Sequence, residues 1–218
     1  MIFSRNWVFN TLLVGSVFFF TAISAQGLFA QQSDTPAFDR VKQLFEEGKV
    51  FTAQFSHEYN DSFTGESQRT DGQIWIGKNR YKIEGDLQQV VVDGDFSTVY
   101  DGSKNRVIIS DYVEEEDDFA PSRMLQGVQD DFTAREELLS SGETKITLTS
   151  TDVFSVFFEV FIYVSADGIP LRIEAIDQAD NELLTGFENG RFIDETEDLF
   201  EVKVPENAEL IDLRLDAR

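Results

Sequence analysis

VFSVFFEVFIYV, residues 153–164, is an almost wholly apolar stretch whose one charge is Glu159. It lies in an acidic chain of 218 residues that has 18 Lys and Arg against 41 Asp and Glu, a net charge of −23. The stretch is too short to cross a bilayer as a helix, which takes about 20 residues. It must therefore be buried by the protein itself or by a molecule that the protein carries.

The alternation within this stretch predicts a long β-strand with one fully apolar face. At roughly 3.3 Å per residue such a strand would be long enough to curve along the concave side of a sheet. The central strand of an ordinary core is the alternative interpretation. The even positions form the apolar face, and they are Phe154, Val156, Phe158, Val160, Ile162 and Val164.

The first thirty residues have the order of a secretory signal peptide. Arg5 lies in a short polar start, and an apolar run over residues 8–23 is followed by small residues. Cleavage after Ala30 is favoured over cleavage after Ala25. An uncleaved anchor helix is less consistent with so short an apolar run. We therefore expect residues 1–30 to be a signal peptide and residues 31–218 to form a single exported domain.

Composition excludes several classes of site and partner. The chain has no cysteine, which excludes disulfides, thiolate zinc sites, cysteine nucleophiles and a lipid anchor on an N-terminal thiol. Its negative charge repels nucleic acid and anionic lipid headgroups, so neither is an expected partner.

One helix is predicted before the strands begin. Thr35 is a suitable N-cap, Pro36 fits the first helical position and Gly48 ends the pattern. An apolar stripe at helical spacing forms its packing face, made of Phe38, Val41, Leu44 and Phe45.

From residue 50 the period changes to two and predicts antiparallel strands. VFTAQFSHEY, GQIWIG and NRYKIEG alternate, and VVVDGDFSTVYDGSKNRVIIS reads as three short strands. Later strands are expected in KITLTS, in the opening stretch, and in IPLRIEAID, NELLTGFEN and LFEVKVP. Asp-Gly pairs tolerate positive φ and predict turns at 71–72, 93–94, 101–102 and 167–168.

A helical insert is expected between the two runs of strands. Pro121 can begin one short helix, and Thr133 with Glu136 forms a capping box for a second helix that ends at Gly142. The acidic run 114–118 could hold calcium, although such runs are more often solvated loops. The expected fold is mainly β with α, of the α+β class.

Catalytic patterns are weak in this sequence. His57 is the one histidine, and its place between Phe55 and Tyr59 on an apolar strand face suits a half-buried structural role. We therefore expect no enzyme activity, no catalytic residues, no metal and no cofactor.

The order of several segments resembles the LolA family of periplasmic outer-membrane lipoprotein carriers. The matching segments, from Phe38 to Asp212, are FTAQFSH, GQIWI, VVVDG, Tyr100 before Asp-Gly, and DLFEVKVPENAELID. The resemblance implies an incomplete antiparallel β-barrel, a half-barrel covered by a helical lid. Its apolar cavity would shelter the acyl chains of a lipoprotein.

The resemblance also implies roles for particular residues. The lid helix would include Met124 and Leu125. In the family, an arginine that precedes a proline after the tryptophan strand latches the lid. Lys78 occupies the corresponding position here, and Arg80 follows two positions later. The latch role would be shared by these two residues. The cavity would be lined by Phe51, Phe55, Trp75, Phe154, Val156, Phe158, Val160 and Ile162.

Implied partners are acylated lipoproteins, an inner-membrane lipoprotein-releasing ABC transporter and an outer-membrane acceptor, all met in the periplasm by a monomer. One alternative is a periplasmic regulatory domain of the same fold that senses lipid or lipoprotein. A secreted hydrolase and a structural β-domain with a core filled by its own side chains are further alternatives.

Overall fold

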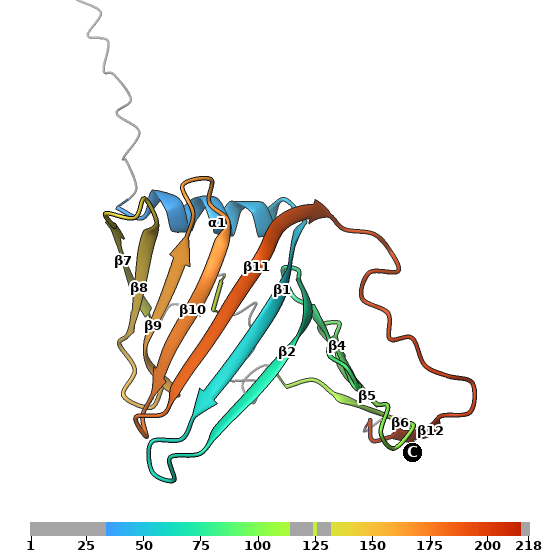
Figure 1. The fold of residues 1–218 in the computed structure, drawn as a ribbon. Helices are drawn as coiled ribbons and strands as arrows, with labels where there is room; N and C mark the ends of the chain where they lie inside the picture. The colour runs from blue at the N-terminus through green and yellow to red at the C-terminus, as the bar shows by residue number, and fades with distance from the viewer. Residues whose placement is uncertain (1–33, 114–123, 126–131, 215–218) are drawn as a thin grey trace, which may run out of the picture. The chain divides into compact units, whose positions relative to one another are not determined.

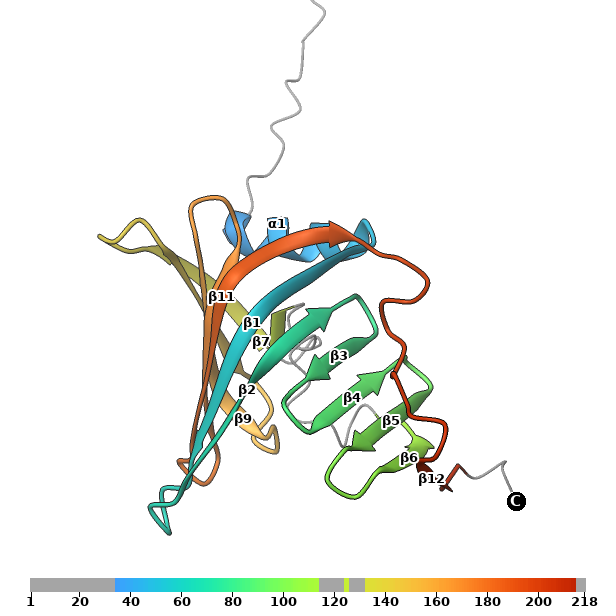
Figure 2. The same cartoon turned by 45° about the vertical axis from the view of Figure 1, so that its right-hand side comes forward.

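The computed structural model describes residues 34–113, 124–125 and 132–214, which form one helix and twelve strands in a single sheet (Figures 1 and 2). The expected signal peptide, the acidic run 114–118 and the helix at Pro121 lie outside these residues. The elements are α1 (Pro36–Glu46), β1 (Lys49–Asn60), β2 (Ser67–Ile76), β3 (Tyr81–Glu84), β4 (Gln88–Val92), β5 (Phe96–Asp101), β6 (Arg106–Asp111), β7 (Phe132–Leu138), β8 (Thr144–Ser150), β9 (Phe157–Val164), β10 (Pro170–Asp177), β11 (Glu182–Asp194) and β12 (Glu209–Asp212).

Two antiparallel meanders are joined into this one sheet. β1 to β6 follow one another on one side, β7 to β11 on the other, and β11 pairs with β1 between them. β12 adds to β6 as the one parallel pair among the described strands. β7 and β12 are the two edges, and the sheet is open. The prediction of a mainly β, incomplete antiparallel barrel is confirmed.

The helix α1 is held at its first turn by a residue from the far edge of the sheet. Pro36 occupies the first turn as expected, but the Thr35 side chain caps no backbone N–H. Instead the backbone N–H of Phe38 donates to Glu136 Oε1 in β7, at 2.6 Å. Gly48, at φ 78°, ends the helix as predicted.

Glu136 corrects one expectation from the sequence. The capping box predicts a helix over 133–142, but Phe132–Leu138 is the edge strand β7, and Gly142 lies in the turn to β8 at φ 87°. The intrinsic helix preference of this Glu-rich segment is weak compared with a ladder of strand hydrogen bonds. The carboxylate that would cap its own helix satisfies α1 instead.

The predicted turns at 93–94, 101–102 and 167–168 are confirmed, whereas the one at 71–72 is wrong. Asp71 and Gly72 lie inside β2, where a Cβ on Gly72 would meet the backbone oxygen of Glu84 at 2.2 Å. This glycine therefore permits a close approach of β3 and makes no turn. The strand expected at 199–205 is also wrong, since that segment is irregular and the last strand is β12.

The Phe-rich strand is shorter than predicted and changes face near its start. β9 begins at Phe157, and the register with β10 shifts between Ile176 and Asp177, which pair with Glu159 and Phe157. Phe158 is the extra residue of this bulge. Phe157 and Val160 are consequently both buried, although they differ by an odd number of positions.

Candidate functional site: the inner face of the sheet

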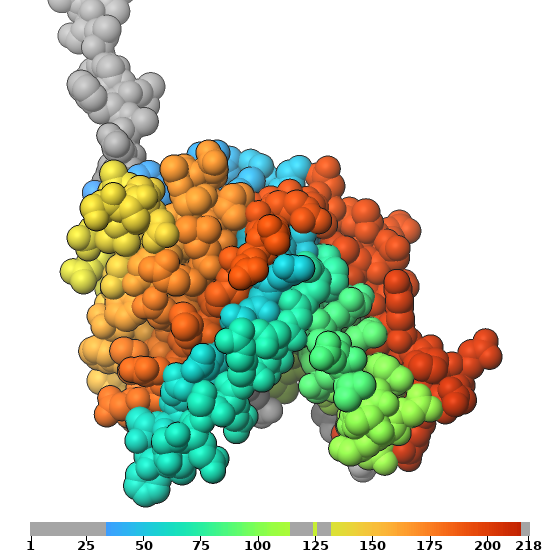
Figure 3. All heavy atoms as spheres, viewed as in Figure 1, coloured from blue at the N-terminus to red at the C-terminus, as the bar shows by residue number. Residues whose placement is uncertain are grey.

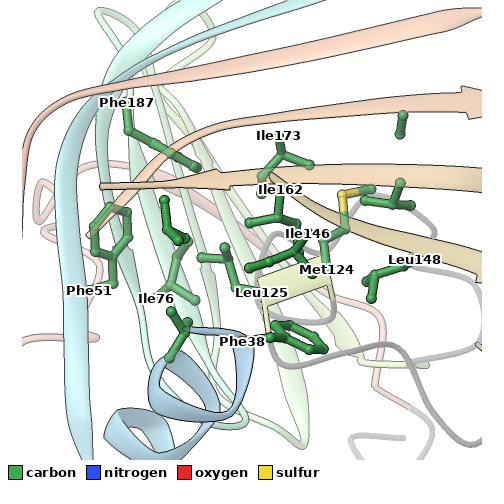
Figure 4. Close-up of a cluster of buried hydrophobic side chains, with 14 of the residues drawn as sticks. Phe38, Phe51, Ile76, Met124, Leu125, Ile146, Leu148, Ile162, Ile173 and Phe187 are labelled. Carbon is green, nitrogen blue, oxygen red and sulfur yellow. The ribbon is translucent and has the colours of Figure 1, made fainter. Parts of the chain in front are cut away.

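One face of the sheet, here called the inner face, carries the main hydrophobic cluster under α1 (Figure 4). Cross-strand pairing aligns its side chains from β8 across to β2, so that apolar residues meet directly opposite one another. The strand residues of the cluster are Phe51, Ala53, Phe55, Ile74, Ile76, Ile146, Leu148, Phe157, Val160, Ile162, Val164, Ile173, Ala175, Leu183 and Phe187.

A chain of phenylalanine rings links the inner face to α1. The Phe51 ring lies 5.2 Å from that of Phe187 and 5.4 Å from that of Phe192, measured between centroids. Phe192 in turn makes an edge contact at 5.5 Å with Phe45 of α1. Phe187 and Phe192 share a face because a bulge in β11 interrupts the alternation, and a Cβ on Gly190 there would meet the Phe51 ring at 2.9 Å.

Among the described residues, α1 and the pair Met124 and Leu125 cover this cluster. Phe38, Val41 and Phe45 of α1 are buried against it. Met124 and Leu125 are helical and have 2% and 0% of their surface exposed; Figure 4 shows both lying among the strand side chains. The two residues expected in the lid helix therefore pack on the inner face.

Beyond the cluster, the inner face continues as a row of aliphatic side chains that sequence reasoning missed. Each member is paired directly with the next across β2 to β6 and β12, and all but the first are half-buried. The row is Ile74, Ile83, Val90, Val99, Ile108 and Ile211. The period-two alternation around the Asp-Gly turns could have identified its middle members, but only the pairing shows that they adjoin one another.

The space-filling view shows a hollow between the β1–β2 hairpin and the strands β4 to β6 (Figure 3). This limb of the sheet holds the aliphatic row and has no α1 against it in either ribbon view (Figures 1 and 2). Among the described residues, α1 packs on the part of the inner face that carries the main cluster, whereas the members of the row on β3 to β6 and β12 are half-buried.

The residues expected to line the cavity divide into two groups. Phe51, Phe55, Val160 and Ile162 lie in the inner-face cluster. The other four lie outside this cluster, and the inward orientation expected for Trp75 is wrong. These four are Trp75, Phe154, Val156 and Phe158.

Trp75 lies on the outer face of β2, because Ile74 and Ile76 on either side of it point inward. There it packs with a second cluster that includes Phe200, and Lys82 Nζ lies 5.3 Å from its ring centroid. The C-terminal segment covers this outer face, so the tryptophan is a packing residue of the outside of the sheet.

Phe154 and Val156 precede β9, and their side chains are 87% and 41% exposed. Phe158, in the bulge, is 60% exposed. These three residues are therefore exposed, whereas Val160 and Ile162 of the same stretch are buried in the cluster. Their role in binding acyl chains, like that of the other four cavity residues, stays a prediction.

The two candidate latch residues hold different segments. Lys78 Nζ lies 2.6 Å from Glu46 Oε2 at the end of α1. Arg80 pairs with Glu195 and stacks 4.8 Å above the Phe200 ring centroid, so it fastens the C-terminal segment. Only Lys78 contacts a covering element of the inner face, and both partners of its ion pair are largely exposed.

His57 lies on the inner face, with Nδ1 3.0 Å from the hydroxyl of Thr185. Burial lowers the pKa of its imidazole, because the charged form loses hydration. Within the described ranges, no group of three or more His, Cys, Asp or Glu side chains is placed to hold a metal ion. The same residues contain no helix that is long and apolar enough to cross a membrane.

Recesses also occur on the outer face. One of about 710 Å³ lies over β1, β2, β10 and β11 and mixes Leu171 and Leu184 with paired charges such as Arg69 and Asp71. Another, of about 520 Å³, lies between β4 to β6 and the C-terminal segment. Both are more polar than the inner face, which remains the better candidate for an apolar ligand.

Neither a family model nor a curated protein sequence matches this chain. Among solved structures, an uncharacterized conserved protein from Thermus thermophilus matches with a TM-score of 0.53 and 16% identity, over 83% of this chain and 99% of that one. A LolA superfamily protein from Nitrosomonas europaea matches with a TM-score of 0.42 and 13% identity, over 78% and 98%. The Mycobacterium tuberculosis lipoprotein LppX matches with a TM-score of 0.35 and 14% identity, over 72% and 96%.

The Thermus match shows that the fold is shared with a solved structure. At these identities the likeness is one of fold.

Proposed function

We propose that this protein is a periplasmic carrier that binds the acyl chains of lipoproteins on its inner face and moves them from the inner to the outer membrane. It would act by binding and release, without a catalytic step. An inner-membrane lipoprotein-releasing ABC transporter would load it, and an outer-membrane acceptor would unload it.

The observation that supports this most directly is the aliphatic row from Ile74 to Ile211. A sheet face in contact with water would carry mostly polar side chains. A sheet face in a closed core would carry apolar side chains that are fully buried. These aliphatic side chains are instead paired across the whole limb and left half-buried. Such a surface suits a flexible hydrocarbon chain, which makes no hydrogen bonds and needs only apolar area.

The energetics of a lipoprotein require such a surface. Exposing hydrocarbon to water costs about 0.8 kcal/mol per CH₂, so one long acyl chain costs roughly 12 kcal/mol. A lipoprotein with several chains would not cross an aqueous compartment at a useful rate unless a protein covered them.

The cover of the inner face explains how cargo could enter and leave. α1 contributes three buried side chains, and Met124 and Leu125 contribute two more. Among the described residues, a hydrogen bond from Phe38 N to Glu136 Oε1 and the exposed Lys78–Glu46 ion pair fasten the two ends of α1. Acyl chains that replaced the covering side chains would exchange one set of apolar contacts for another, at little net cost.

Lipid analysis and transfer together test the proposal. We expect protein purified without detergent to contain acylated lipid by mass spectrometry, or to take up a triacylated lipoprotein from membranes into a soluble complex. Protein that is free of lipid and also fails to release lipoprotein from membranes would overturn the proposal.

Adjacent isoleucines in β6 provide a matched pair of variants. Ile108 faces inward and Ile109 faces the outer recess, and both are half-buried. Ile108→Glu is expected to abolish most lipoprotein uptake, whereas Ile109→Glu should retain it. Equal uptake by the two variants would show that the inner face is not the binding surface.

A further inference from the structure

Three loops gather at the end of the sheet opposite α1 (Figures 1 and 2). They are residues 61–66 between β1 and β2, residues 151–158 from the end of β8 into the bulge of β9, and residues 178–181 between β10 and β11. Together these segments are called the loop rim. Apart from Phe157, whose side chain belongs to the inner-face cluster, the loop rim is separate from that cluster and from the aliphatic row.

Hydrogen bonds between the loops fix the loop rim as one unit. Ser62 N donates to Asn181 Oδ1 at 2.9 Å, and Ser62 Oγ donates to the backbone oxygen of Ala179 at 2.8 Å. On the other side, Gln178 Nε2 donates to the backbone oxygens of Val153 and Ser155, at 2.7 and 2.6 Å. The middle loop therefore ties its two neighbours together.

The loop rim presents large apolar side chains to solvent. Phe63 is 96% exposed and Phe154 is 87% exposed, and Val153, Val156 and Phe158 are also exposed. Isolated exposed apolar residues are ordinary, but several on adjoining loops that are held in place typically mark an interaction surface. Because the loops are already ordered, binding loses little conformational entropy.

The charges of the loop rim are all of one sign. Its three segments contain Asp61, Glu66, Asp152 and Asp180 and no Lys, Arg or His. An acidic, aromatic surface complements one that combines an apolar recess with basic side chains. A second copy of this chain would bring acids against acids at a net charge of −23 each, and an anionic bilayer would be repelled in the same way.

We propose that the loop rim docks a partner protein whose contact surface has an apolar recess surrounded by lysine and arginine. Phe63 and Phe154 are the anchors that enter the recess, and the surrounding carboxylates pair with the basic side chains. This inference goes beyond the proposed carriage of acyl chains, because it concerns a different surface and holds whatever the inner face binds.

The test uses a synthetic amphipathic helical peptide of leucine and lysine, with a leucine–glutamate peptide of the same pattern as its control. Binding to the purified protein is measured by fluorescence anisotropy of the labelled peptide and mapped by NMR shifts of backbone amides. We expect the lysine peptide to bind, to shift amides of the loop rim, and to weaken as salt is raised. The glutamate peptide should not bind.

The double variant Phe63→Ser/Phe154→Ser is expected to weaken binding of the lysine peptide at least about tenfold, as for anchors at a contact centre. Both side chains are exposed, so the melting temperature should stay unchanged and report intact folding. Leu210→Ser, which removes a 63% exposed leucine of β12 outside the loop rim, is the control and should leave the affinity unchanged.

The inference is overturned if Leu210→Ser weakens binding as much as the double variant does, or if the double variant binds like the unmodified protein. Binding of phosphatidylcholine vesicles that depends on Phe63 and Phe154, without binding of the lysine peptide, would assign the loop rim to a membrane surface instead. Dimerisation that the double variant abolishes would assign it to a second copy. Ile108→Glu should bind the peptide normally, which separates this test from that of the acyl carrier.

Discussion

Phe51 and Phe154 show how differently one sheet treats the same side chain. Phe51 has none of its surface exposed and contacts Phe187 and Phe192 under α1. Phe154 has 87% of its surface exposed on the loop rim, at the other end of the strands. The contrast teaches that the phenylalanines of this protein serve two purposes, cohesion of the inner face at one end and presentation to solvent at the other.

The largest effect that tests this comparison is the loss of stability on truncating each ring. Phe51→Ala is expected to lower the free energy of unfolding by about 3–5 kcal/mol, because it leaves a cavity among packed rings. Phe154→Ala should change it by no more than about 0.5 kcal/mol. Urea unfolding of both variants measures the difference, and similar losses would remove the distinction between the two regions.

The tightness of the covered region is tested by adding a methyl group. Gly190→Ala would place a Cβ 2.9 Å from the Phe51 ring, and overpacking of this kind costs about 1–3 kcal/mol. Gly186→Ala, in the same strand, meets only Ser56 Oγ at 3.5 Å and should be nearly neutral. If calorimetry finds the two variants equally stable, the Phe51 pocket is looser than the structure indicates.

A smaller effect is expected where α1 is fastened. Glu136→Ala removes the acceptor of Phe38 N–H and should cost about 0.5–2 kcal/mol, as for the loss of a helix cap. Glu137→Ala, on the exposed side of β7, is the control. Lys78→Ala should cost less than Glu136→Ala, because exposed ion pairs contribute at most about 1 kcal/mol.

Hydrogen exchange of the α1 amides distinguishes these variants. Faster exchange confined to the first turn in Glu136→Ala, and to the last turn in Lys78→Ala, would confirm the two fastenings. Unchanged exchange in Glu136→Ala would mean that the packing of Phe38, Val41 and Phe45 alone holds the helix.

The smallest effect concerns His57, which lies on the inner face between the two regions. Because burial lowers its pKa in the folded state below the ordinary 6.5, the unfolded chain binds the proton more readily. The stability associated with neutral His57 is therefore present above pH 6.5 and is lost as the pH falls below that value. His57→Gln should lose less stability than the unmodified protein between neutral and acidic pH, as followed by urea unfolding; identical pH dependences would contradict this.

The sequence alone determined the secondary structure of several alternating segments. VFTAQFSHEY and IPLRIEAID are β1 and β10 as predicted, and the Asp-Gly pair at 93–94 joins two strands. It also assigned Phe51 and Phe55 to the inner face, because a strand with a period of two has only two sides.

Only the tertiary structure decided the rest, because the competing states are locally close in energy. Residues 132–138 favour a helix by themselves, but pairing with β8 makes them a strand whose Glu136 caps α1. The bulge at Phe158 shifts the register of the Phe-rich stretch against β10, and no periodicity can place a bulge that depends on the neighbouring strand. Likewise Ile108 and Ile211 are far apart in the chain, and only the β6–β12 pairing makes them neighbours in the aliphatic row.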